Sequence, residues 1–186
     1  ENKAQKRLEL KIMSRGRRIV PLTKEEIEKM KAVCKLAART LEYAGKFVKV
    51  GITTEELDQI VHEYTLSNGA TCSPLGYHGY PKSICTSINQ VICHGLPDST
   101  KLKNGDIINV DVTSFKDGFH GDCSATFMVG EVSAKAREIT EVAEQARDKG
   151  IEAITPRGMT GDIGFAIDKY ITRRGYSSVK EIGGHG

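Results

Sequence analysis

The stretch VDVTSFKDGFHGDCS, residues 110–124, places Asp111 and Asp122 on either side of an Asp-Gly pair at 117–118. An Asp-Gly pair flanked by apolar and β-branched residues is typical of a type I′ hairpin turn. Folding the chain about this turn sets Thr113 opposite Asp122, so Asp111 lies diagonally across from Asp122 on the same face of the ribbon. The two Cα atoms are then about 7–8 Å apart, which lets both carboxylates reach one cluster of cations.

A pair of carboxylates in a β-ribbon needs something that offsets its repulsion. Two like charges about 4 Å apart repel by roughly 4 kcal/mol at an effective dielectric of about 20. The strand around Asp111, IINVDVT, is apolar on both faces, which predicts burial, and a buried carboxylate requires a partner. Lys116 is nearby but belongs to the other face. We favour a bound metal over the alternative, which is two solvated aspartates.

The composition is that of a globular domain without a membrane-spanning segment. The chain has 186 residues, of which 39% are hydrophobic and 27% charged, and it has no apolar run of about 18 residues. The five cysteines are odd in number and form no CxxC pair, which favours free thiols in a reducing compartment. No apolar secretory segment lies near the start. We therefore expect a cytoplasmic protein, with an organelle as the alternative.

Residues 1–20 form a basic arm ahead of a domain that we place at residues 21–186. The arm holds seven lysine and arginine residues against two glutamates. Basic arms bind nucleic acid or acidic surfaces, although many charge runs are only solvated tails.

Helical periodicity flanks a β-rich middle. Apolar residues recur at steps of three and four over residues 24–46, and a capping box at Thr53–Glu56 opens a second helix that ends near residue 68. The same periodicity predicts two further helices around residues 139–146 and 163–170. Short β-branched segments predict strands at residues 84–87, 91–94, 107–113 and 125–129.

Two histidines stand in glycine-rich surroundings. His94 lies in VICHGLPD and His185 in IGGHG, and glycine lets a backbone approach a ligand closely. Together with the two strand aspartates they suit a hydrolase with two metal ions. We expect His62 to lie on a helix surface. His78 and His120 receive no role, although hairpin geometry puts His120 on the aspartate face, nearer the turn.

Three strings of this sequence resemble one family. They are YHGYPKSICTSINQVICHGLPD at 77–98, NVDVTSFKDGFHGDCS at 109–124 and GGHG at 183–186. They resemble the type I methionine aminopeptidases, and the resemblance runs from about residue 24 to the end. It implies an α+β pita-bread fold, in which an antiparallel sheet is covered by two pairs of helices. It also implies that the last sheet segment is missing from this chain.

The resemblance assigns roles to individual residues of this sequence. A dinuclear site for two divalent ions (cobalt, manganese, iron or zinc) takes ligands from the two aspartates and a histidine. A second, non-ligand histidine contacts substrate and assists catalysis, and further side chains line a pocket for methionine. The implied metal ligands are Asp111, Asp122 and His185, the catalytic residue is His94, and the substrate-binding residues are Tyr77, Tyr80, Cys85 and His94.

The resemblance also implies an activity. The family removes the initiator methionine from nascent polypeptides when the second residue is small, by attack of a metal-bridging water on the first peptide carbonyl. We expect nascent polypeptide N-termini as partners, a monomer, and no membrane association. The arm at residues 1–20 could dock on the ribosome, because rRNA is a polyanion.

Two features depart from the family pattern. Cys123 stands where the family has threonine; it points away from the aspartate face, so we expect tolerance. The family also carries two glutamate ligands after the GHG motif, one of which is the general base, and neither occurs in these 186 residues. We therefore expect the 186 residues alone to be inactive. Release of methionine from a Met-Ala peptide by the pure chain would contradict this expectation.

Two other functions stay open. A related pita-bread peptidase that cleaves before proline would turn over Ala-Pro substrates rather than Met-Ala, whereas the string Cys93-His94-Gly95 and the two pocket tyrosines favour methionine. A non-catalytic pita-bread protein that binds RNA or a protein partner would bind no divalent ion.

Overall fold

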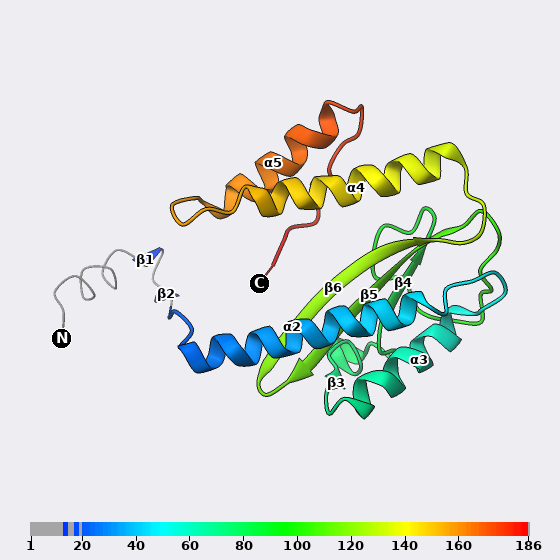
Figure 1. Cartoon of the computed structure of the whole chain (residues 1–186), viewed down its shortest axis with the longest axis horizontal. Helices are drawn as coiled ribbons and strands as arrows, with labels where there is room; N and C mark the ends of the chain where they lie inside the picture. Colours follow the sequence, from blue (N-terminus) through cyan, green and yellow to red (C-terminus); the bar gives the residue numbers. More distant parts are fainter. Residues whose placement is uncertain (1–12, 15–16, 19, 186) are drawn as a thin grey trace.

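The computed structural model describes residues 13–14, 17–18 and 20–185 (Figure 1). Most of the basic arm, and with it any role of the arm, lies outside the described residues. The helices are α2 (Lys24–Gly45), α3 (Thr54–Ser67), α4 (Ala134–Glu152) and α5 (Thr160–Thr172), with a 3₁₀ turn, η1, at Tyr77–Gly79. The strands are β1 (Met13–Ser14), β2 (Arg17–Arg18), β3 (Thr71–Cys72), β4 (Cys85–Ile88), β5 (Ile107–Lys116) and β6 (Phe119–Met128).

The predicted hairpin is formed, and its first strand, β5, is the centre of the sheet. Strands β5 and β6 are antiparallel along their whole length, with Thr113 opposite Asp122 as the turn signal predicts. Asp117 and Gly118 have φ values of 52° and 88°, the left-handed conformation that a type I′ turn requires at both positions. Strands β3 and β4 pair with different parts of β5, on the edge opposite β6. Both hairpin strands are longer than the sequence pattern predicts.

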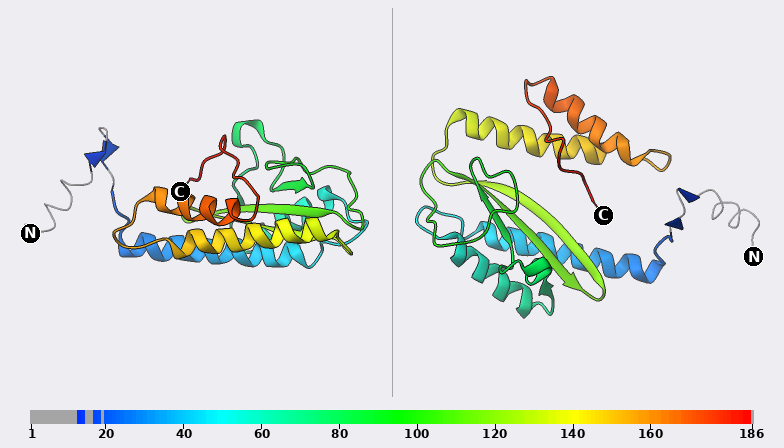
Figure 2. Two further views of the ribbon diagram at one scale, coloured as in Figure 1. Left: turned by 90° about the horizontal axis from the view of Figure 1, so that it is seen from above. Right: turned by 180° about the vertical axis from the view of Figure 1, so that it is seen from behind.

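The two faces of the hairpin differ sharply in burial. Ile108, Val110 and Val112 point from β5 into the main core, where they pack with side chains of α2 and α3. Cys123 packs against the same core, so it points away from the aspartates as expected. The alternate residues of β5 lie on the opposite face, where Asp111 is half-buried and Phe115, near the turn, is exposed. The left view of Figure 2 shows the sheet nearly edge-on, with α2 and α4 along one side of it.

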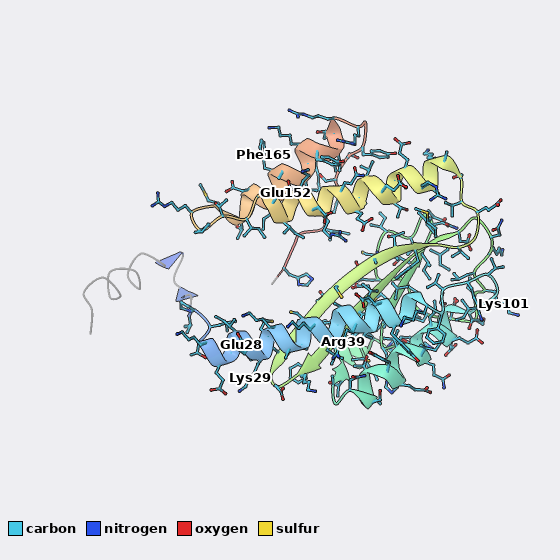
Figure 3. All side chains as sticks on the ribbon, in the orientation of Figure 1. Glu28, Lys29, Arg39, Lys101, Glu152 and Phe165 are labelled. Carbon is cyan, nitrogen blue, oxygen red and sulfur yellow. The ribbon has the colours of Figure 1, made fainter. Side chains whose placement is uncertain are left out.

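The four long helices form two pairs, as predicted, but only one pair packs on the sheet. Helices α2 and α3 lie on the sheet, whereas α4 and α5 pack mainly on each other through a separate cluster of Val142, Ala146 and Ile171. Figure 1 shows α4 and α5 beside the sheet, beyond β6. Phe165 of α5, labelled in Figure 3, is exposed. Among the described residues, the sheet is therefore covered by one helix pair.

The strand predicted at residues 91–94 is not formed, and that prediction is wrong. Val91 and Ile92 are exposed, and His94 has a φ of 55°, which breaks an extended conformation. The physical reason lies in β4: the Thr86 N–H donates to the carbonyl of Gly95 at 2.8 Å. The returning chain thus meets the edge of β4 as a loop. Within the described residues, no helix is both long and apolar enough to span a membrane.

Candidate metal centre and substrate pocket

The two hairpin aspartates share the half-open face of the sheet. Asp111 lies opposite Cys85 of β4 on one side and Ser124 of β6 on the other. Asp122 lies opposite Thr113, whose hydroxyl donates to Asp122 Oδ1 at 2.8 Å. The burial predicted for this face is only partly right, because Asp111 is half-buried while the side chain of Asp122 is 36% exposed.

The electrostatics of Asp111 favour a cation. Burial raises the pKa of the Asp111 carboxyl, and the charge of Asp122 raises it further; His94 and His185 lower it. Both raising effects show that the ionised form lacks full compensation. Within residues 20–185, no lysine or arginine forms an ion pair with either aspartate. A divalent ion would supply the missing positive charge.

His185 approaches the hairpin from the distant C-terminal segment. Its Nε2 lies 3.5 Å from Asp122 Oδ2, and Figure 1 shows this end of the chain running toward β6. The carboxylate and imidazole donors are those that divalent transition metals take. Among the described residues, however, no three histidine, cysteine or acidic side chains are close enough together to hold an ion. The donor types therefore suit a divalent metal, although Asp111, Asp122 and His185 do not form a three-ligand cluster in this structure.

Tyr80 and Cys85 lie next to the aspartate face. The Tyr80 hydroxyl donates to the Ile84 carbonyl at 2.9 Å and lies 3.4 Å from the Gly95 carbonyl oxygen. Burial, followed by its contact with Cys85, raises the pKa of the Tyr80 phenol well above its usual value. Cys85 is buried, and burial raises the pKa of its thiol. Both groups are therefore neutral, as the lining of an apolar side-chain pocket should be.

Tyr77 is placed differently from the other predicted pocket residues. It is 69% exposed and packs edge-on against His78, with 4.4 Å between the ring centroids. His78 itself has a φ of 46°. The structure thus brings Tyr80 and Cys85 together beside Asp111, but it leaves Tyr77 on the surface of the η1 turn.

His94 is exposed, and the residue that follows it anchors the loop. The N–H of Gly95 donates to Ser87 Oγ at 3.2 Å, and its carbonyl accepts from Thr86. A Cβ on Gly95 would lie 2.1 Å from the Thr86 carbonyl oxygen, so only glycine fits there.

The remaining histidines are both engaged. His120 lies on the aspartate face near the turn, as predicted, where its Nδ1 is 2.8 Å from Ser73 Oγ. The expectation that His62 is a surface residue is wrong, because it is half-buried and its Nδ1 lies 2.8 Å from Ser83 Oγ. The sequence pattern missed Asp58, which accepts hydrogen bonds from the same segment. Its spacing of four residues from His62 on a predicted helix was an available signal.

Comparison with known proteins gives consistent matches along the chain. The sequence pattern of metallopeptidase family M24 matches residues 28–186. The chain is 49% identical over 172 residues to methionine aminopeptidase A of Synechocystis sp., covering 92% of this chain and 68% of that protein. It is 46% identical over 164 residues to the methionine aminopeptidase of Rickettsia prowazekii, covering 88% of this chain and 63% of that protein.

Solved structures show the same likeness. The crystal structure of methionine aminopeptidase from Rickettsia prowazekii has a TM-score of 0.83 at 45% identity, covering 86% of this chain and 64% of that one. The methionine aminopeptidase from Thermotoga maritima has a TM-score of 0.87 at 32% identity, covering 90% and 68%. The prolidase from Pyrococcus furiosus shares the fold, with a TM-score of 0.72 at 23% identity. The chain thus spans about two thirds of the length of its methionine aminopeptidase relatives.

Proposed function

Because this chain belongs to metallopeptidase family M24 and is similar to methionine aminopeptidases over most of its length, we propose that the protein containing it removes N-terminal methionine from polypeptides. The observation that supports this most directly is the aspartate face of the hairpin. Asp111 and Asp122 share this face, His185 Nε2 lies 3.5 Å from Asp122 Oδ2, and the uncharged Tyr80 and Cys85 lie beside Asp111, without a lysine or arginine ion pair from residues 20–185 to either aspartate. The preferred substrates have a small second residue.

In this proposal Asp111, Asp122 and His185 hold divalent metal. Two ions of cobalt, manganese, iron or zinc suit carboxylate and imidazole donors. Bound metal supplies Lewis acidity toward a carbonyl and a water of lowered pKa. Thr113 orients the Asp122 carboxylate through its hydroxyl, leaving Oδ2 on the side of His185. The resemblance implies two further glutamate ligands, so the test requires the full-length protein.

The residues around the metal face bind and orient the substrate. Tyr80 and Cys85 offer a phenol and a thiol, both uncharged, to an unbranched apolar side chain. Tyr77 reaches the substrate only at the rim, since it is exposed. His94, on the exposed loop beside β4, donates a hydrogen bond to the substrate peptide and steadies the charge that develops there.

The experiment is a paired substitution in the hairpin of the full-length protein. We expect Asp111→Asn and Asp122→Asn each to lower divalent-metal affinity by at least about tenfold and methionine release from Met-Ala-Ser by about a hundredfold or more. Asp117→Asn is the matched control: it changes an aspartate of the same hairpin, in the turn, where asparagine accepts the left-handed conformation. Unaltered metal affinity and turnover in both ligand variants would contradict the proposal.

The two alternatives predict different results in the same assays. Faster turnover of Ala-Pro than of Met-Ala would indicate a proline-directed peptidase of the same fold. The prolidase from Pyrococcus furiosus has this fold. A full-length protein that binds no divalent ion would belong to the non-catalytic class.

The partners and location are further parts of the proposal. We infer that a monomer acts on nascent polypeptide N-termini in the cytoplasm, or in an organelle, and that residues 1–20 dock on the ribosome through charge. Co-sedimentation with ribosomes should weaken as salt rises, because phosphate contacts release counterions. Identical binding after deletion of residues 1–20 would exclude this role for the arm.

A further inference from the structure

One side of α3 carries polar residues that hold the segment leading into β4. Asp58 Oδ1 accepts the N–H of Ser83 at 2.7 Å and the N–H of Ile84 at 3.0 Å. One turn further along α3, His62 Nδ1 lies 2.8 Å from Ser83 Oγ. One turn before Asp58, Glu55 forms an ion pair with Lys82. Three successive residues, 82–84, are therefore each held by one side of the same helix.

The Asp58 contacts are buried and specific. Ser83 is 3% exposed and Ile84 is fully buried, so neither N–H could turn to water if the carboxylate were removed. Hydrogen bonds to a carboxylate are shorter and stronger than those between neutral groups. The half-burial of Asp58 raises its pKa, while the two N–H groups lower it. Asp58 is thus a partly desolvated carboxylate that accepts hydrogen bonds from two backbone N–H groups.

Ile84 links α3 to Tyr80. Its N–H donates to Asp58 and its carbonyl accepts from the Tyr80 hydroxyl, so one peptide segment is held from both sides. The next residue, Cys85, begins β4 directly opposite Asp111. Tyr80 and Cys85 therefore stand at the two ends of a short loop whose centre is fixed by Asp58.

We propose that Asp58, assisted by His62, is a positioning residue that fixes Tyr80 and Cys85 relative to Asp111 and thereby sets the selectivity for an unbranched first side chain. This inference rests on the proposed function. Loss of the Asp58 bonds lets the loop move outward, so the pocket accepts branched side chains more readily. The metal ligands belong to β5, β6 and the C-terminal segment, so their affinity for metal stays the same.

The test compares variants of α3 in the full-length protein. We expect Asp58→Ala to lower the preference for Met-Ala over Leu-Ala, as a ratio of kcat/KM, by roughly tenfold, with unchanged metal affinity by calorimetry. Asp58→Asn retains an acceptor oxygen and should shift the ratio less. Glu63→Ala is the matched control, because Glu63 is exposed on the same helix and bonds only to the Gln59 side chain among the described contacts.

A second readout does not depend on aminopeptidase activity. Cys85 is buried whereas Cys34 is exposed, so alkylation by iodoacetamide, measured peptide by peptide, should accelerate at Cys85 relative to Cys34 in Asp58→Ala.

If the parent protein releases no methionine, the proposed function fails, and this thiol measurement alone decides the positioning role. If Asp58→Ala does not fold, Asp58→Asn and His62→Ala take its place, with smaller shifts in the same direction. A lowered Tm with unchanged selectivity and unchanged Cys85 reactivity would overturn the proposal.

Discussion

At the scale of single residues, the candidate centre depends on side chains that orient its ligands. Asp122 has two carboxylate oxygens with different surroundings: Oδ1 accepts from the Thr113 hydroxyl and Oδ2 faces His185. A hydrogen bond to one oxygen fixes the rotation of the carboxylate and so the direction of the other. The hairpin register places Thr113 opposite Asp122, which makes this contact a consequence of the turn.

Thr113→Val tests the orienting role of this hydroxyl. Valine keeps the shape and the β propensity but removes the donor, so we expect about a tenfold loss of divalent-metal affinity with little change in Tm. Calorimetric titration of the full-length protein with Mn²⁺ measures the loss. Thr126→Val serves as the control, because Thr126 lies in the same hairpin, on β6, and accepts a hydrogen bond from Asn109 instead. Equal affinities in both variants would count against the role of Thr113.

Gly95 is the residue at which sterics alone give a prediction. A methyl group there would meet the Thr86 carbonyl, so Gly95→Ala should separate the His94 loop from β4. We expect a loss of about 1–3 kcal/mol in the free energy of unfolding, typical of overpacking. We also expect turnover to fall under conditions where the variant is still folded, because His94 is displaced. Gly164→Ala in α5, where a Cβ meets open space, should instead be neutral or stabilising. Similar denaturation midpoints for the two variants would contradict this reading of Gly95.

At the scale of elements, the helices on the sheet begin with the same device. Thr23 before α2 and Thr53 before α3 each accept from the backbone N–H of a glutamate three residues on, and that glutamate accepts the threonine N–H in return. These reciprocal bonds satisfy amide groups that a helix start leaves free. They lower the pKa of Glu26 and Glu56 below the ordinary value of 4.5, chiefly through the backbone bond to the capping threonine.

The lowered pKa values predict the direction of acid sensitivity. A carboxyl whose pKa is depressed by folding contributes stability that is fully present above its unfolded pKa and is lost as pH falls through the folded pKa. Between about pH 5 and about pH 3, Tm should therefore fall, and it should fall less steeply in Glu56→Gln, because an amide does not titrate. Thermal unfolding followed by circular dichroism at a series of pH values measures both slopes. A variant as acid-sensitive as the parent would show that the α3 cap plays no part.

At the scale of the whole molecule, the described chain has two apolar clusters rather than one. The main core joins the hairpin to α2 and α3, while α4 and α5 enclose a small cluster around Val142 and Ile171. Several large apolar side chains in and next to α4 and α5 are exposed, including Met159 and Phe165. Regions with few buried apolar groups open at lower free energy than the main core.

Hydrogen exchange should distinguish the main core from the smaller cluster between α4 and α5. On the 186-residue chain, we expect amides of α4 and α5 to exchange faster than those at the centre of β5 and of α3, because the smaller cluster opens without disrupting the sheet. Exchange followed by mass spectrometry gives the protection of each segment. Uniform protection across both units would show that the molecule opens as one cooperative body.

The sequence by itself determined the features that are encoded within a few neighbouring residues. The Asp-Gly turn, the hairpin register, the shared face of Asp111 and Asp122 and the first two helix starts all follow from local rules of geometry and hydrogen bonding. Those rules hold wherever the segment lies, because they depend on periods of two or of 3.6 residues.

The tertiary structure alone decided the features that depend on distant segments. The chain at 91–94 is apolar enough for a strand, yet its neighbour Gly95 pairs with Thr86 as a loop. Asp58 and Ser83 meet across 25 residues of sequence, and His185 reaches Asp122 from the far end of the described chain. No local period encodes such contacts, because they form only when packing of α3 and the C-terminal segment brings the partners together.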